Sequence, residues 1–143
     1  YIDYASRFKE LGVMMIEQPL PAGSDLQLAS IPHPIPVCAD ESCHDTSTLK
    51  ELSGKYDMIN IKLDKTGGLT EALKLKRLAL EQGFQIMVGC MIGTSLAMAP
   101  GLVVGQGAAV VDLDGPLLLK DDRENGLEFK GSTINVPSEL LWG

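Results

Sequence analysis

The feature that most constrains this chain is a regular alternation between short apolar runs and helix-like segments. The first run, residues 13–17, lacks polar–apolar alternation, which is typical of a strand covered on both faces. Including it, we expect five strands, over residues 13–17, 36–40, 58–63, 84–89 and 109–114. Strands separated by helices pair in parallel through right-handed crossovers, so the sequence predicts an α/β fold.

The segments between the strands carry ordinary helix signals. Residues 2–11 form an amphipathic pattern that ends at Gly12, and residues 45–52 begin with Asp45 as a helix cap. Further helical segments are expected around 25–29, over 69–83 after the TGG sequence, and over 94–104, where Pro100 interrupts the pattern.

Two architectures fit this alternation, an open doubly wound sheet and a β/α barrel. The one candidate phosphate turn, TGG at 66–68, lacks the spacing of a nucleotide-binding fingerprint. A complete β/α barrel of the TIM type takes about 250 residues, so this sequence of 143 residues predicts only part of a barrel. We assign the partial barrel to residues 1–116 and a C-terminal tail to residues 117–143, where LEFKGSTINVP suggests a short β excursion.

Composition argues against several classes of function. The net charge of −7 and the absence of a basic stripe argue against a nucleic-acid partner. No apolar run reaches the length of a membrane span, and the first residues do not resemble a signal peptide. Three cysteines without a CxxC pair favour buried thiols in a reducing cytoplasm. Because the chain lacks an initiator Met and opens inside a helix, we expect it to be a piece of a longer protein.

Ionisable residues stand at the ends of all the predicted strands except the fourth. They are Glu17, Asp40 with Glu41, Lys62 with Lys65 just beyond, and Asp112 with Asp114. In a β/α barrel these ends surround one mouth, where catalytic residues lie. Because strand residues two apart share a face, each group can point into the barrel while its neighbour faces the helices. The fourth strand ends in Gly89 and Gly93, which would let the backbone approach a ligand.

These residue types suit metal-assisted proton abstraction. Two carboxylates on adjacent strands fit a hard cation such as Mg²⁺, which takes oxygen ligands and keeps several waters. A lysine across the mouth can then act as the general base next to a substrate carboxylate. Plainer alternatives are a solvated turn for Glu17, an ion pair from Lys62 to Asp40 or Glu41, and a cap or polar turn for the two aspartates.

Five short motifs resemble the second half of an enolase-superfamily barrel. They are IEQP at 16–19, ADES at 39–42, NIKLDKTGG at 60–68, GCM at 89–91 and DLDGP at 112–116. A lysine or histidine base with Mg²⁺ is characteristic of that superfamily. NIKLDKTGG and DLDGP are narrower motifs, and they resemble the L-Ala-D/L-Glu epimerase-like dipeptide epimerases of the muconate-lactonizing subgroup.

The resemblance implies an isomerase that transfers a proton at the α-carbon of a dipeptide through an enolate, in peptidoglycan peptide recycling. In the implied site, Glu17 and Asp40 are Mg²⁺ ligands and Lys62 is the acid/base. Glu41 and Lys65 lie in the second layer around the metal ligands. The residues around the substrate are Asp112, Asp114, Cys90 and Met91. The aspartate pair would bind the ammonium group of the dipeptide. A third metal ligand, the base for the opposite face and a capping domain would precede residue 1, and the tail would return toward that cap.

Two alternatives stay open. The first is another reaction on the same scaffold, muconate cycloisomerisation or o-succinylbenzoate synthesis, which would not need an ammonium site at Asp112 and Asp114. The second is a non-catalytic half-barrel with unpaired edge strands. We also expect a small-molecule partner and no nucleic acid or membrane, and we leave open a homo-oligomer of the full-length protein.

Overall fold

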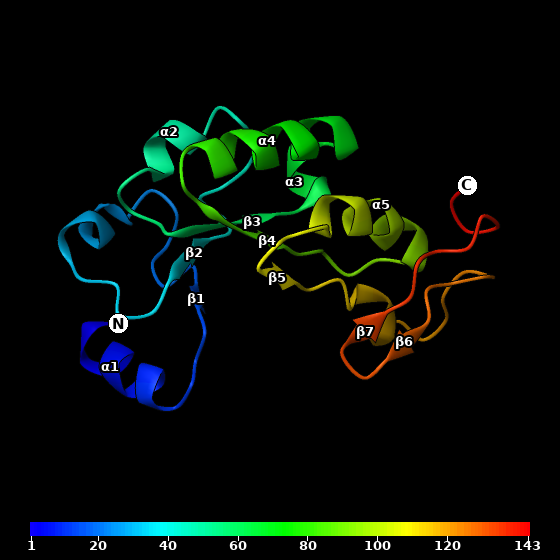
Figure 1. The fold of residues 1–143 in the computed structure, drawn as a ribbon, viewed down its shortest axis with the longest axis horizontal. Helices are drawn as coiled ribbons and strands as arrows, with labels where there is room; N and C mark the ends of the chain where they lie inside the picture. The colour runs from blue at the N-terminus through cyan, green and yellow to red at the C-terminus, as the bar shows by residue number, and fades with distance from the viewer.

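The computed structural model describes all residues from 1 to 143, and its centre is a five-stranded parallel sheet (Figure 1). The strands are β1 (Ile16–Glu17), β2 (Val37–Ala39), β3 (Met58–Ile61), β4 (Gln85–Val88) and β5 (Val110–Val111). Each strand pairs with the next one in the sequence, in the order β1-β2-β3-β4-β5. The predicted α/β fold with five parallel strands is confirmed, and the curled sheet is a segment of a β/α barrel.

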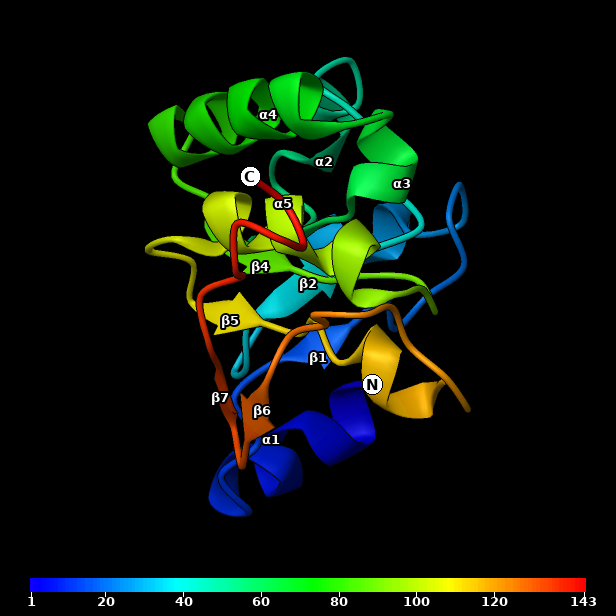
Figure 2. The same ribbon diagram turned by 90° about the vertical axis from the view of Figure 1, so that its right-hand side faces the viewer.

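Helical segments connect the strands. They are α1 (Ile2–Glu10), η1 (Leu26–Ser30), α2 (Leu49–Leu52), α3 (Leu63–Thr66), α4 (Leu69–Glu81), α5 (Ser95–Gly105) and η2 (Gly115–Leu118). Figures 1 and 2 show α2, α4 and α5 on one side of the sheet, while α1 lies beyond the edge strand β1. None of these helices combines the length and the hydrophobicity that a membrane span requires.

The main core lies between the sheet and these helices. Nineteen buried residues form one apolar cluster, to which the strands contribute Val37, Ala39, Ile59, Ile61, Ile86 and Val88. Full burial of each large aliphatic side chain stabilises the fold by about 1.5–3 kcal/mol. The alternate strand residues Cys38, Met58 and Met87 form a separate small cluster on the other face. Strand residues therefore alternate between the helix side and the barrel interior, as the sequence predicts.

The strands are shorter than predicted, and the first is less covered. Residues 13–15 precede β1, and Met14 is 77% exposed, so the expectation of burial on both faces is wrong there. The reason is that β1 is an edge strand, with β2 as its only neighbour. At β3 the strand ends at Ile61, and Leu63 already begins α3, which leaves Lys62 at the junction.

Two helix predictions also need correction. The segment 45–52 is helical only from Leu49, because the Asp45 carboxylate accepts hydrogen bonds from the backbone N–H and the hydroxyl of Ser47 in a local turn. Helix α5 runs through Pro100 without interruption. The helix is held at both ends, since Asp122 accepts from the Ser95 N–H and Lys76 Nζ donates to the carbonyl of Val104.

The C-terminal tail contains the predicted β excursion. It is an antiparallel hairpin of β6 (Phe129–Lys130) and β7 (Thr133–Ile134). The tail is tied to the N-terminal end of α5, where Asp122 accepts from Ser95 and the backbone N–H of Leu127 donates to the Ser95 hydroxyl. The division of the chain at residues 116 and 117 stays a prediction, since η2 runs across it.

Candidate active site

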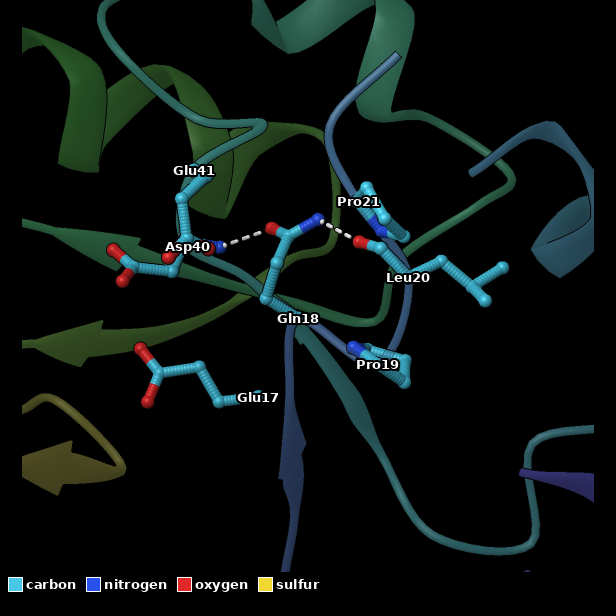
Figure 3. A pocket seen from close by; sticks show the side chains of 7 residues that line it. All are labelled: Glu17, Gln18, Pro19, Leu20, Pro21, Asp40 and Glu41. Carbon is cyan, nitrogen blue, oxygen red and sulfur yellow. Dashed lines mark hydrogen bonds between the residues drawn. The ribbon is translucent and has the colours of Figure 1, made fainter. Parts of the chain in front are cut away.

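Ionisable side chains converge where the parallel strands end. Glu17 is the last residue of β1, Asp40 follows β2 directly, and Lys62 follows β3 directly. Figure 3 shows the carboxylates of Glu17 and Asp40 directed into the same open space. The adjacent pocket has a volume of about 640 Å³, and its lining is Glu17, Gln18, Pro19, Leu20, Pro21, Asp40 and Glu41.

Glu17 is oriented by an asparagine on β3. Asn60 Nδ2 donates a hydrogen bond of 2.5 Å to Glu17 Oε1, and Asn60 is only 1% exposed. A Cβ atom at Gly89 would lie 2.7 Å from both amide atoms of Asn60, so the glycine makes room for that side chain. The sequence reasoning gave Asn60 no role, although a lone amide inside the buried MINI strand was the available signal.

Asp40 is held by two lysines. Its side chain accepts hydrogen bonds from Lys62 Nζ at 2.6 Å and from Lys65 Nζ at 2.7 Å, and the residue is 8% exposed. Burial would raise the pKa of the Asp40 carboxyl, but the hydrogen bonds from the two ammonium groups outweigh burial and lower it. Asp40 is therefore a carboxylate at neutral pH.

The two lysines differ in how firmly they are bound. Lys65 Nζ also donates to the backbone carbonyls of Asp40 at 2.6 Å and Asn60 at 3.0 Å, which makes three acceptors for its three protons. Lys62 Nζ has the single acceptor Asp40 Oδ2. Burial would lower the pKa of Lys62, but the bond to Asp40 and the charges of nearby carboxylates raise it. The ion pair considered as an alternative for Lys62 is present, and Lys62 is the more loosely held lysine.

The donor set suits a hard divalent cation. Glu17 and Asp40 present carboxylate oxygens at one mouth, and Asp40 already attracts two ammonium groups to its oxygens. No group of three or more His, Cys, Asp or Glu side chains in the chain is arranged to hold a metal ion. The two carboxylates thus fit as part of a magnesium site, with the other ligands coming from water, from substrate or from outside this chain.

The motifs GCM and DLDGP meet at the other side of the mouth. A Cβ at Gly115 would lie 2.8 Å from the carbonyl oxygen of Met91 and 3.3 Å from Cys90 Sγ, so the loop after β4 packs directly on Gly115. Burial raises the pKa of the Cys90 thiol, which keeps it protonated at neutral pH. Met91 is exposed.

Asp112 and Asp114 follow β5 and are both exposed. Partial burial and the charge of Asp114 raise the pKa of Asp112, while the charge of Lys62 opposes that shift. Asp114 precedes η2 but makes no capping hydrogen bond through its side chain. The helix cap considered for this residue is therefore absent, and neither aspartate forms an ion pair within the chain.

Comparisons with known proteins agree with this geometry. Residues 1–140 match the model of the family described as enolase C-terminal domain-like. The chain belongs to this family.

Among characterised relatives, an N-acetyl-D-glutamate racemase from a Pseudoalteromonas species is 52% identical over 135 residues, 94% of this chain and 43% of the racemase. L-Ala-D/L-Glu epimerase from Escherichia coli is 55% identical over 127 residues, 89% of this chain and 40% of the epimerase. This chain thus spans about two fifths of the length of these relatives.

A solved structure covers almost the whole chain. It is an enolase family member from Agrobacterium tumefaciens, with homology to dipeptide epimerases, with bound sodium and L-Ala-L-Glu. It superposes with a TM-score of 0.96 at 57% identity, and the match covers 99% of this chain and 44% of that protein. The predicted resemblance to the C-terminal portion of an enolase-superfamily barrel is confirmed.

Proposed function

We propose that the complete enzyme to which this chain corresponds is a Mg²⁺-dependent dipeptide epimerase that transfers a proton at the α-carbon through an enolate. The observation that carries the proposal is the position of Lys62. Lys62 follows β3, the middle strand of the sheet, and its Nζ donates to Asp40, while Glu17 ends β1 and Asp112 follows β5. Lys62 therefore lies between a carboxylate pair suited to a metal and an aspartate pair suited to an ammonium group.

Proton transfer requires Lys62 to exchange partners. When bound, Mg²⁺ would supply positive charge that stabilises the negative charge developing on the substrate carboxylate. To take the α-proton, the Lys62 ammonium must first release a proton to solvent and leave Asp40 Oδ2, its one acceptor, because only the neutral amine can act as a base. Lys65 keeps its three acceptors and continues to hold Asp40 in place. The chain supplies the acid/base for one face of the substrate, and epimerisation needs a second group on the opposite face.

The aspartate pair supports a substrate with a free amino terminus. Partial burial and repulsion from Asp114 raise the pKa of Asp112, and an ammonium group between the two carboxylates would relieve this repulsion. The epimerase from Escherichia coli, 55% identical, is named for such a dipeptide, and the Agrobacterium protein was solved with L-Ala-L-Glu. A dipeptide with a free amine is therefore the substrate class that we assign.

A second candidate is racemisation of an N-acylated amino acid, which the 52% identity to an N-acetyl-D-glutamate racemase favours. This substrate carries no ammonium group, so it would leave Asp112 and Asp114 without a cationic partner. Both reactions begin with the same abstraction of an α-proton, and Lys62 would serve in either. The two reactions differ in whether Asp112 and Asp114 bind an ammonium group of the substrate.

Exchange of the α-proton with solvent tests the proposal. The complete enzyme would be incubated with Mg²⁺ in D₂O, in parallel with L-Ala-D-Glu, L-Ala-L-Glu and N-acetyl-D-glutamate, and followed by proton NMR. We expect deuterium at the α-carbon of the C-terminal residue of the dipeptides. Exchange confined to N-acetyl-D-glutamate would favour the racemase. No exchange in any dipeptide would exclude the epimerase and leave the cycloisomerase and dehydratase reactions of the same scaffold.

A further inference from the structure

Gln18 adopts an unfavourable backbone conformation next to a proposed metal ligand. It follows Glu17 directly and has a φ of +38°, one of two positive φ values among the non-glycine residues of the chain. Side chains other than glycine rarely adopt this region, and such strain persists only where the surroundings impose it. In Figure 3 the turn sends the Gln18 side chain between the Asp40 backbone and Leu20, while Glu17 points into the open space.

The amide of Gln18 joins the ends of β1 and β2. Its Oε1 accepts hydrogen bonds from the backbone N–H groups of Asp40 at 2.8 Å and Ser42 at 3.2 Å. Its Nε2 donates to the carbonyl of Leu20 at 2.7 Å and lies 2.9 Å from the hydroxyl of Tyr56. One side chain thus binds the backbone on both sides of the pocket, including the N–H of Asp40 itself.

A buried polar group behind the pocket holds this amide in place. Asp25 is 3% exposed, and its carboxylate accepts from Ser42 Oγ at 2.8 Å, Tyr56 OH at 2.7 Å and Lys55 Nζ at 2.6 Å. Ser42 and Tyr56 also contact Gln18 Nε2. A buried carboxylate such as Asp25 is costly unless hydrogen-bond donors compensate it. The network around Asp25 therefore holds Ser42 and Tyr56, and through them the Gln18 amide, in a fixed geometry.

We propose that Gln18 is a positioning residue that fixes the separation of the Glu17 and Asp40 carboxylates, by tying the end of β1 to the loop after β2. The inference rests on the proposed role of these carboxylates as metal ligands. The left-handed turn at Gln18 places its amide between the backbone of Asp40 and that of Leu20. The hydrogen bonds of the Gln18 amide, rather than the turn, set the position of Asp40.

Two substitutions separate the amide from the turn. Gln18→Gly removes the hydrogen bonds but makes the positive φ favourable, whereas Gln18→Ala removes the hydrogen bonds and keeps the strain. Gln82→Ala, at the exposed C-terminal end of α4, is the matched control. Binding of Mn²⁺ to the complete enzyme is measured by electron paramagnetic resonance, and exchange of the Asp40 and Ser42 amide protons by NMR. Thermal unfolding is recorded for every variant.

We expect both Gln18 variants to bind Mn²⁺ at least ~10-fold more weakly than the wild-type protein, and their Asp40 and Ser42 amides to exchange at least ~10-fold faster. Gln18→Gly is expected to unfold at a higher temperature than Gln18→Ala. If Gln18→Gly keeps wild-type Mn²⁺ affinity and amide protection, the turn alone is needed and the proposal is overturned. A lower unfolding temperature with unchanged affinity also overturns it, since Gln18 is then only structural.

The failure of the proposed function would give a different result. Glu17→Gln tests the ligand role directly, because it removes a carboxylate oxygen charge without changing the Gln18 network. If Mn²⁺ binding is lost in Glu17→Gln and in both Gln18 variants, yet no dipeptide exchanges its α-proton, the positioning role stands and the epimerase assignment falls. If the wild-type enzyme binds no Mn²⁺, both are wrong.

Discussion

The two ends of the mouth differ in how their charges are compensated. At the ends of β2 and β3, Asp40 is nearly buried and bonded to two ammonium groups. After β5, Asp112 and Asp114 are exposed, and neither forms an ion pair within the chain. The charge of Asp40 is thus neutralised by lysines of the chain itself, whereas the charges of Asp112 and Asp114 have no cationic partner in the structure.

Under the proposed function, this difference would separate the residues of proton transfer from those that recognise substrate. A buried carboxylate must be paired, so Asp40, Lys62 and Lys65 form a cluster that folds with the protein. An exposed carboxylate pair is solvated and tolerates the absence of a partner, so under the proposed function Asp112 and Asp114 would bind and release the ammonium group. Substitutions at the first end should therefore affect chemistry and stability, and substitutions at the second end mainly substrate affinity.

The largest effect is expected at the two lysines. Lys62→Ala should lower α-proton exchange by ~10³-fold or more, because general acid–base groups typically contribute 10²–10⁴-fold. Lys65→Ala should leave appreciable exchange but lower the free energy of unfolding by about 1–3 kcal/mol, because it removes a donor from buried Asp40. Exchange rates and urea unfolding measure the two effects. The reverse pattern would move the base to Lys65.

A smaller effect, on stability, is expected at Gly89. Gly89→Ala places a Cβ atom 2.7 Å from the Asn60 amide, so Asn60 must move and lose its bond to Glu17. We expect a loss of about 1–3 kcal/mol in the free energy of unfolding, as for overpacked cores. Gly93→Ala is the matched control, because its Cβ would meet chiefly the flexible end of Met98 at 3.3 Å. Equal stability of the two variants would show that the space around Asn60 is not constrained.

At the other end of the mouth, Asp112→Asn should change substrate affinity. We expect KM for a dipeptide with a free amine to rise ~10-fold, because one carboxylate of the ammonium site is lost, while kcat changes less. Steady-state kinetics with L-Ala-D-Glu and with N-acetyl-D-glutamate provide the comparison. If KM for the dipeptide is unchanged, the aspartate pair does not bind the amine, and the alternative reactions gain support.

The smallest effect is a pH-dependent gain in stability from the same substitution. The folded-state pKa of Asp112 is raised by partial burial and by Asp114, so its ionised form opposes folding above that pKa. Asp112→Asn should therefore stabilise the protein slightly at pH 7, and the gain should disappear as the pH falls through the raised pKa toward the ordinary value. Thermal unfolding at pH 7 and at pH 3.5 measures it. A loss of stability at pH 7 would show that Asp112 has a cationic partner in the folded protein.

The sequence predicted the five parallel strands of a partial barrel because strands and helices follow from local periodicity. Alternation of apolar and helix-like segments gave the five strands, and the period of two residues predicted a second face of the sheet, on which Cys38, Met58 and Met87 form a small cluster. It overestimated the lengths of β1 and α2, because exposure at a sheet edge and the turn at Asp45 depend on context. It also missed Asn60 and Gln18, whose partners are 43 and 22 residues away, respectively.

The sequence by itself thus determined which ionisable residues end or follow the strands and which strand residues alternate between the two faces of the sheet. Only the tertiary structure decided that Lys65 is bound by three acceptors and Lys62 by one, and that Gln18 ties the two carboxylate strands together. The physical reason is that strand periodicity acts over two residues, whereas these hydrogen bonds require donor and acceptor atoms from different strand ends to come within about 3 Å of each other.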